Sequence, residues 1–115
     1  MSFTYSIEIK SQYAVVAFHG SLLSAFEAKP FMEELHEVRK NISKFVIDLQ
    51  GLNHLSSEGL GILLQVLTKA RNAGGDAVII NISEDIQKLF IVTKLNSIFT
   101  IKNNLTEASQ FYAGK

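Results

Sequence analysis

Residues 45–67 read FVIDLQGLNHLSSEGLGILLQVL, and they combine two patterns that decide the fold. The first five residues are almost wholly apolar, as in a strand that is covered on both faces of a parallel sheet. From Leu60 onward the leucines recur at helical spacing, and we expect this helix to run to Ala73, where Gly74 and Gly75 end it. A strand, a polar turn and a helix thus follow one another, which is typical of the first half of a strand–helix–strand unit.

The same alternation extends in both directions along the chain. A segment with period-two alternation comes first, and an apolar segment follows it after a short polar break. Together they predict a hairpin, followed by a turn at residues 19–21. Pro30 suits the first turn of a helix, and Ser83 and Asn104 suit the N-caps of two later helices. The elements expected around the central unit are 5–9, 13–18, 30–40, 77–82, 83–93, 99–101 and 104–111. We therefore expect an α/β fold, a mixed sheet with an N-terminal hairpin and then parallel strands, with about four helices packed on it.

The composition restricts the class of protein. One domain spanning residues 1–115 is expected, because a chain of this length buries roughly two-thirds of its unfolded surface. Cysteine is absent and the histidines show no ligand spacing, so no metal site is expected. Eleven basic and eleven acidic residues are interspersed, which argues against direct binding of nucleic acid or membranes. With neither a signal peptide nor a membrane-spanning run, we expect a cytoplasmic protein.

Ser56 and Ser57 stand at the junction of the central strand and helix, and three roles are open to them. Serine is a preferred N-cap, so one of the two is expected to cap the helix, which leaves the second hydroxyl without a role. A nucleophile is disfavoured, because Leu55 replaces the first glycine of a hydrolase elbow and all three histidines precede the serines. The glycine pattern of a nucleotide-binding loop is also incomplete. A covalent phosphate fits the position, since free N–H groups and the helix dipole favour an anion there.

Residues 45–49 and 55–61 resemble the signature of the STAS domain, a family named for sulfate transporters and anti-sigma factor antagonists. Further similarities to the family occur at residues 74–75, 82–86, 93–99 and 105–108, so that the resemblance covers nearly the whole chain. It implies a single STAS domain that acts as an anti-sigma factor antagonist. Such a protein is a switch that sequesters an anti-sigma factor and thereby frees a sigma factor for transcription.

The resemblance also implies how the switch is controlled. The family's phosphoacceptor falls on Ser57, which the serine kinase activity of the anti-sigma factor phosphorylates and a separate phosphatase restores. ATP is bound by that kinase, so no cofactor is expected on this chain, and the chain itself is not expected to be an enzyme. The residues expected to contact the partner are Ser56, Ser57, Glu58, Gly59, Ile62 and Val66.

Ile62 and Val66 are open to two interpretations. At 100° per residue they lie off the leucine stripe of their helix. They form either an apolar strip that a partner covers, or a contact with a neighbouring helix through Ile86 or Phe90. The sequence favours neither.

Three positions depart from the family's pattern. Leu23 stands where relatives often carry an acid, Glu58 replaces a small neutral residue beside Ser57, and Lys94 replaces a glycine. Leu23 and Glu58 favour an alternative function, a non-phosphorylated STAS adapter subunit of a transporter or signalling complex. A small hydrolase or nucleotide-binding enzyme is the least favoured alternative, because no convergent acid–base pair is found.

Overall fold

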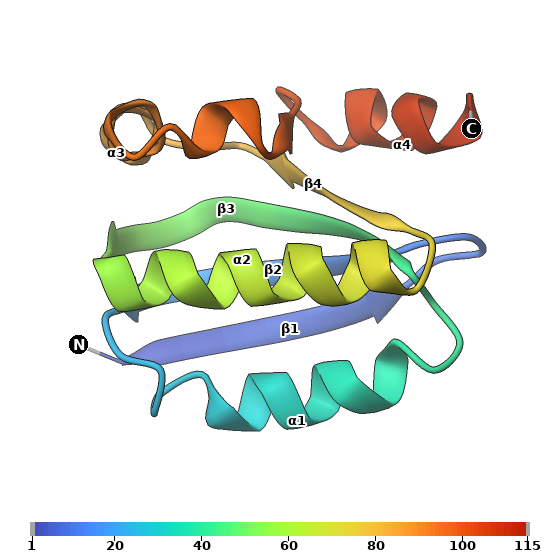
Figure 1. The fold of residues 1–115 in the computed structure, drawn as a ribbon, viewed down its shortest axis with the longest axis horizontal. Coiled ribbons are helices and arrows are strands. Elements are labelled where there is room, and N and C mark those ends of the chain that lie inside the picture. The colour runs from blue at the N-terminus through green and yellow to red at the C-terminus, as the bar shows by residue number, and fades with distance from the viewer. Residues whose placement is uncertain (1, 115) are drawn as a thin grey trace.

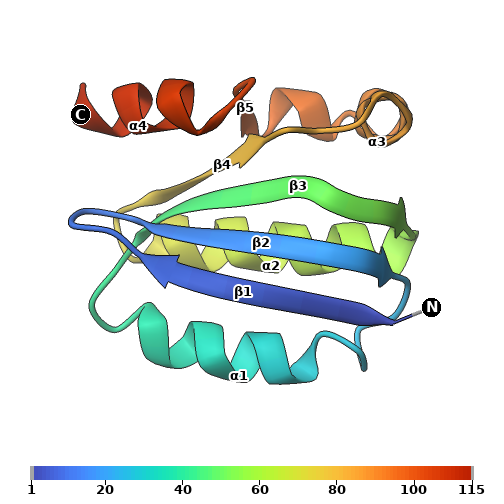
Figure 2. The same ribbon diagram turned by 180° about the vertical axis from the view of Figure 1, so that it is seen from behind.

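The computed structural model describes residues 2–114, which form a five-stranded mixed sheet whose strands lie side by side in chain order (Figures 1 and 2). Strand β1 is antiparallel to β2, and each later pair of neighbours is parallel. The strands are β1 (Phe3–Ile9), β2 (Ala14–Leu22), β3 (Lys44–Leu55), β4 (Asp76–Ile80) and β5 (Thr100–Ile101). The predicted fold, a hairpin followed by parallel strands, is confirmed.

Each parallel pair is joined by a helix, because the chain must return to the starting edge of the sheet before the next strand begins. Helix α1 (Lys29–Val38) joins β2 to β3, and α2 (Ser57–Asn72) joins β3 to β4. Helix α3 (Glu84–Val92) and a short 3₁₀ turn (Leu95–Ser97) join β4 to β5, and α4 (Leu105–Ala113) follows β5.

The sheet separates two apolar cores of unequal size. The larger core is formed by α1, α2 and α3 with residues such as Phe45 and Ile47 of β3. The smaller core lies under α4, and Val46 contributes to it from the same strand. Buried residues on both faces of β3 and β4 explain why these strands read as continuous apolar runs in the sequence.

The predicted helix ends are confirmed. The side chains of Ser56, Ser83 and Asn104 each accept a hydrogen bond from a backbone N–H in the first turn of α2, α3 and α4. Pro30 lies in the first turn of α1, where the missing N–H would have no partner in the helix. Gly74, with φ +86°, follows the end of α2 in the left-handed region that favours glycine.

The predicted turn at residues 19–21 is wrong, because β2 continues to Leu22 and its partner β3 continues to Leu55. Irregularities in the β2–β3 register after Ala17 and after Gly20 allow the strands to stay paired through this polar, glycine-containing stretch. Gly20 has φ +87°, and a side chain there would collide with the backbone of Ser2, just before β1. The extended strands bring the end of β2 against the start of α2.

Candidate functional site

Ser56 and Ser57 occupy different places in the structure. The Ser56 Oγ accepts a hydrogen bond from the Gly59 N–H at 3.2 Å and donates one to the Leu23 carbonyl at 2.8 Å. Ser57 is the first residue of α2, is exposed, and its hydroxyl forms no hydrogen bond within residues 2–114. The hydroxyl that capping leaves without a role is therefore that of Ser57.

The start of α2 packs closely on the end of β2. The Ser56 N–H donates to the Leu22 carbonyl at 3.1 Å. Gly59 is buried, and a Cβ at this position would lie 2.5 Å from the same carbonyl oxygen. Only a residue without a side chain allows this approach, so Gly59 is a packing residue and cannot contact a partner, contrary to the prediction.

The Glu58 side chain extends to the loop between β2 and α1, residues 23–28. Its Oε1 accepts a hydrogen bond from the Ala25 N–H at 3.0 Å, across 33 residues of sequence. A second carboxylate holds the same loop, because the Glu27 Oε1 accepts hydrogen bonds from the N–H groups of Leu23 and Ser24, each at 3.2 Å. Together these contacts fix the β2–α1 loop against the first turn of α2.

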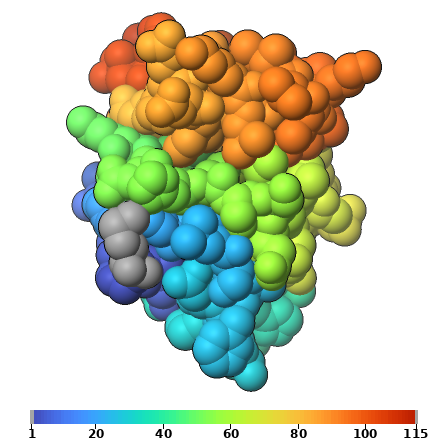
Figure 3. All heavy atoms as spheres, turned by 90° about the vertical axis from the view of Figure 1, so that its left-hand side faces the viewer, coloured from blue at the N-terminus to red at the C-terminus, as the bar shows by residue number. Residues whose placement is uncertain are grey.

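The β2–α1 loop carries two exposed apolar side chains. Phe26 is 84% exposed and Leu23 is 48% exposed. Two further exposed apolar residues, Ile91 and Val92, lie at the end of α3. Figure 3 shows the loop in light blue, the junction of β3 and α2 in green and α3 in orange on one face of the molecule. Ser57 thus lies among segments that expose apolar side chains.

Ile62 and Val66 do not belong to this exposed surface. They are 2% and 0% exposed, and they share the larger core with Ile86 and Phe90 of α3. This burial contradicts an exposed apolar strip at both residues, and the shared core agrees with the alternative, in which the neighbouring helix covers them. The leucine stripe predicts too narrow a buried arc for α2. Both the sheet and the neighbouring helix cover α2, so more of its circumference is buried.

Sequence reasoning missed Phe26 as a candidate contact. The residue stands in the segment LSAFEA, residues 23–28, which has neither strand nor helix periodicity. A large aromatic residue in a loop just before a helix that starts at Pro30 was the available signal. Its exposure depends on the loop conformation, which the periodicity of the sequence does not describe.

Asp48, another polar residue of the sheet, has structural partners. The Asp48 Oδ1 accepts hydrogen bonds from the Asn81 Nδ2 at 3.1 Å and from the Gln50 N–H at 2.9 Å, so Asp48 ties β3 to the end of β4. Within residues 2–114 no three His, Asp or Glu side chains converge as a metal site would require. No helix in the same range is both long and apolar enough to cross a bilayer.

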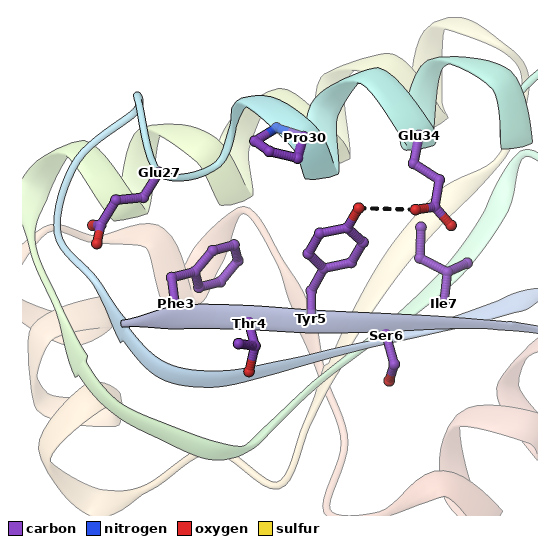
Figure 4. A pocket seen from close by; sticks show the side chains of 8 residues that line it. All are labelled: Phe3, Thr4, Tyr5, Ser6, Ile7, Glu27, Pro30 and Glu34. Atoms are coloured by element: carbon purple, nitrogen blue, oxygen red, sulfur yellow. Dashed lines mark hydrogen bonds between the residues drawn. The ribbon is translucent and has the colours of Figure 1, made fainter. Parts of the chain in front are cut away.

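An open trough of about 430 Å³ runs between β1 and α1, away from Ser57 (Figure 4). Within it the Tyr5 hydroxyl donates a hydrogen bond to the Glu34 Oε1 at 2.8 Å. Burial raises the pKa of Tyr5, and the Glu34 acceptor raises it further. No histidine lines the trough.

The chain belongs to the STAS domain family, because the sequence model of that domain matches residues 5–108. Among curated proteins, the anti-sigma-B factor antagonist of Listeria monocytogenes is 29% identical over 102 residues, which cover 85% of this chain and 89% of that protein. The family predicted from the motifs around Ser57 is thus confirmed.

Two solved structures share the fold. An anti-sigma factor antagonist from Mycobacterium paratuberculosis superposes with a TM-score of 0.77 at 23% identity, over 95% of this chain and 92% of that one. The Bacillus cell fate determinant SpoIIAA in its phosphorylated form gives a TM-score of 0.74 at 15% identity, over 95% and 99% of the two chains.

Proposed function

We propose that this protein is an anti-sigma factor antagonist whose binding is controlled by phosphorylation of Ser57. The observation that carries the proposal is the free, exposed Ser57 hydroxyl, next to a Ser56 hydroxyl that is fully engaged in capping. A curated relative is named an anti-sigma-B factor antagonist, and SpoIIAA, which has the same fold, is known in a phosphorylated form. Both support the proposal.

The position of Ser57 suits a reversible phosphate. At the first residue of α2 the group would face unpaired N–H groups and the positive end of the helix dipole, so the fold tolerates it. A partner docked on the same surface would meet a new charge of about −1.5 to −2, which weakens binding. The start of α2 therefore stays helical while the interaction changes.

The proposed partners are an anti-sigma factor and a phosphatase. The anti-sigma factor binds ATP and phosphorylates Ser57, and the phosphatase removes the phosphate. We propose that the chain itself is not an enzyme. The Ser57 hydroxyl has no side-chain hydrogen-bond partner within residues 2–114, which supports a role as phosphoacceptor and not as a catalytic nucleophile. A cytoplasmic location follows from a function in transcription.

The second candidate is a STAS adapter that is never phosphorylated. Leu23, half-exposed where the family often carries an acid, and the negative charge of Glu58 beside Ser57 favour it. On that hypothesis the same surface binds a partner permanently, and a phosphate on Ser57 has no physiological donor.

One experiment separates the two candidates. Partners captured on the wild-type protein are incubated with it and ATP, and mass spectrometry then locates phosphate within residues 52–61. The antagonist hypothesis predicts phosphate on Ser57, its loss in Ser57→Ala and its retention in Ser56→Ala. A captured partner that hydrolyses ATP but leaves all of these residues unmodified would contradict the switch and favour the adapter.

A further inference from the structure

We propose that Glu58 is a positioning residue that couples the charge at Ser57 to the conformation of the β2–α1 loop, and so to the presentation of Phe26. This inference rests on the proposed function in one respect: it requires that Ser57 be phosphorylated. It adds a mechanism of regulation to that site. Three features of the structure lead to it: a carboxylate that spans two elements, an exposed aromatic side chain, and a phosphoacceptor adjacent to the carboxylate.

The β2–α1 loop is fixed by contacts of two kinds. Glu27 acts inside the loop, through the N–H groups of Leu23 and Ser24. Ser56 and Glu58 act from α2, through the Leu23 carbonyl and the Ala25 N–H respectively. The Glu58 contact is the charged one of the two, so it is the link that a neighbouring charge can disturb.

Phe26 follows directly on the residue that Glu58 holds. Ala25 is anchored by its N–H, and Ala28 is 0% exposed, so the loop is tethered on both sides of Phe26. The ring is 84% exposed. Aromatic side chains held in this way are the usual anchors of protein interfaces, because little conformational entropy is lost when they bind. The partner we infer therefore has an apolar pocket for Phe26 beside the site that reaches Ser57.

A phosphate on Ser57 would add a second negative group one residue before Glu58, in the same first turn of α2. Like charges at this separation repel, and the repulsion displaces the more mobile group, the glutamate side chain. The Ala25 N–H then loses its acceptor, and the loop loses its charged link to α2. It keeps the contacts of Glu27 and Ser56 and the turn bonds that the Ala28 and Lys29 N–H groups donate to the Ala25 and Phe26 carbonyls. Phosphorylation would thus weaken binding twice: by its own charge, and by releasing Phe26 from its fixed orientation.

The test uses hydrogen exchange of the Ala25 amide, measured by NMR on protein in which phosphoserine is genetically encoded at position 57. We expect exchange at Ala25 to be about tenfold faster with phosphoserine than with serine, the factor expected for loss of a hydrogen bond to a charged acceptor. Glu58→Ala should give a similar acceleration without phosphate. The Leu23 and Ser24 amides, which Glu27 holds, should change far less in both cases.

Glu58→Gln is the decisive variant, because it keeps an acceptor oxygen for the Ala25 N–H and removes the charge. In this variant phosphoserine at position 57 should alter Ala25 exchange less than about twofold. Glu84→Ala, which removes an exposed carboxylate in the first turn of α3, serves as the matched control and should leave Ala25 unchanged.

Two outcomes would overturn the proposal. Either Ala25 exchange is the same with serine and phosphoserine, or phosphoserine accelerates it equally in wild type and Glu58→Gln. A phosphate oxygen that itself accepts the Ala25 N–H would give the first outcome. Because the phosphoserine is encoded, no kinase is needed. A failure here leaves the proposed function standing, and the absence of a natural kinase does not affect this measurement.

Discussion

Ser56 and Ser57 are the same amino acid, and one position along the helix separates their roles. At the N-cap the side chain is outside the helix and reaches back to the Gly59 N–H, whereas at the first helical residue it projects into solvent. Glu58, one residue further, is turned toward the β2–α1 loop. Three consecutive side chains thus have three different surroundings: Ser56 caps the helix, Ser57 is exposed, and Glu58 contacts the β2–α1 loop.

The two serines should differ in their effect on stability. Ser56→Ala removes the cap of α2 and a hydrogen bond to the Leu23 carbonyl, and we expect it to lower the free energy of unfolding by about 1–2 kcal/mol. Ser57→Ala removes an exposed hydroxyl without a partner and should change it by less than about 0.5 kcal/mol. Urea denaturation of both variants measures this difference, and equal losses would show that capping is shared.

The charge of Glu58 should also affect the rate at which a kinase modifies Ser57. A carboxylate beside the acceptor repels the phosphates of ATP, so Glu58→Gln should speed phosphorylation, with the larger gain at low ionic strength. Glutamine is preferred to alanine here because it preserves the contact with the Ala25 N–H. If Glu58→Gln instead slows phosphorylation and weakens partner binding, Glu58 contacts a basic group of the partner, as the adapter hypothesis expects.

Helix α2 illustrates how elements are positioned by their glycines. Gly59 and Gly61 are two residues apart in the same turn, yet only Gly59 faces the end of β2. Gly61 has no neighbouring atom within 4 Å of where a Cβ would stand. The first is required for packing, and the second is a helix residue of low propensity without a packing role.

Alanine substitutions should therefore act in opposite directions. Gly59→Ala forces a Cβ against the Leu22 carbonyl, and we expect a loss of about 1–3 kcal/mol in the free energy of unfolding. Gly61→Ala meets nothing and should stabilise the protein by about 0.5–1 kcal/mol, through the better helix propensity of alanine. Thermal unfolding of the pair checks the prediction, and destabilisation by Gly61→Ala would mean that the turn needs glycine for another reason.

At the scale of the whole molecule, the two faces of the sheet serve different purposes. The larger core fixes α1, α2 and α3, and with them the surface around Ser57. The smaller core fixes α4, whose Tyr112 hydroxyl has one proton to donate and two carbonyl acceptors within reach, Phe45 at 2.6 Å and Asp76 at 2.9 Å. Tyr112 thus anchors the C-terminal helix to the starts of β3 and β4, and this end of the sheet is remote from the candidate site.

The stability of this anchor should depend on pH. Burial, followed by the nearby Asp76 carboxylate, raises the pKa of Tyr112 well above its usual value. The neutral hydroxyl is therefore favoured in the folded state, so its contribution is fully present below about pH 10 and is lost as pH rises above that value. Tyr112→Phe should lower the free energy of unfolding by about 1–3 kcal/mol at pH 7. Between about pH 9 and 11 the variant should lose less further stability than wild type, because it has no hydroxyl to ionise. Urea denaturation across that range tests both parts.

The face that carries Ser57 should bind its partner through Phe26. Truncation by Phe26→Ala should weaken the affinity for the captured partner at least tenfold, about the loss of an interface anchor, without lowering the melting temperature. Ile9→Ala removes another exposed apolar side chain, 60% exposed near the opposite end of the β1–β2 hairpin, and should leave affinity unchanged. Calorimetric titration compares the two, and equal effects would show that the binding surface lies elsewhere.

Much of the fold was predictable because its signals are local. Strand alternation, helix periodicity, the caps at Ser56, Ser83 and Asn104 and the stop at Gly74 all depend on residues within one or two turns of each other. The same locality made Ser57 recognisable as a residue at a helix start. The extension of β2 and β3 was missed because it depends on cross-strand irregularities that have no short-range pattern.

The sequence by itself determined the order of the elements, the family and the position of Ser57 at the start of a helix. Only the tertiary structure decided which side chains surround Ser57. Ile62 and Val66 are taken into the core because both the sheet and α3 cover α2. The loop that carries Leu23 and Phe26 is brought against the start of α2, where Glu58 holds it across 33 residues. The physical reason is that burial and long-range hydrogen bonds depend on how elements pack, whereas periodicity describes one element at a time.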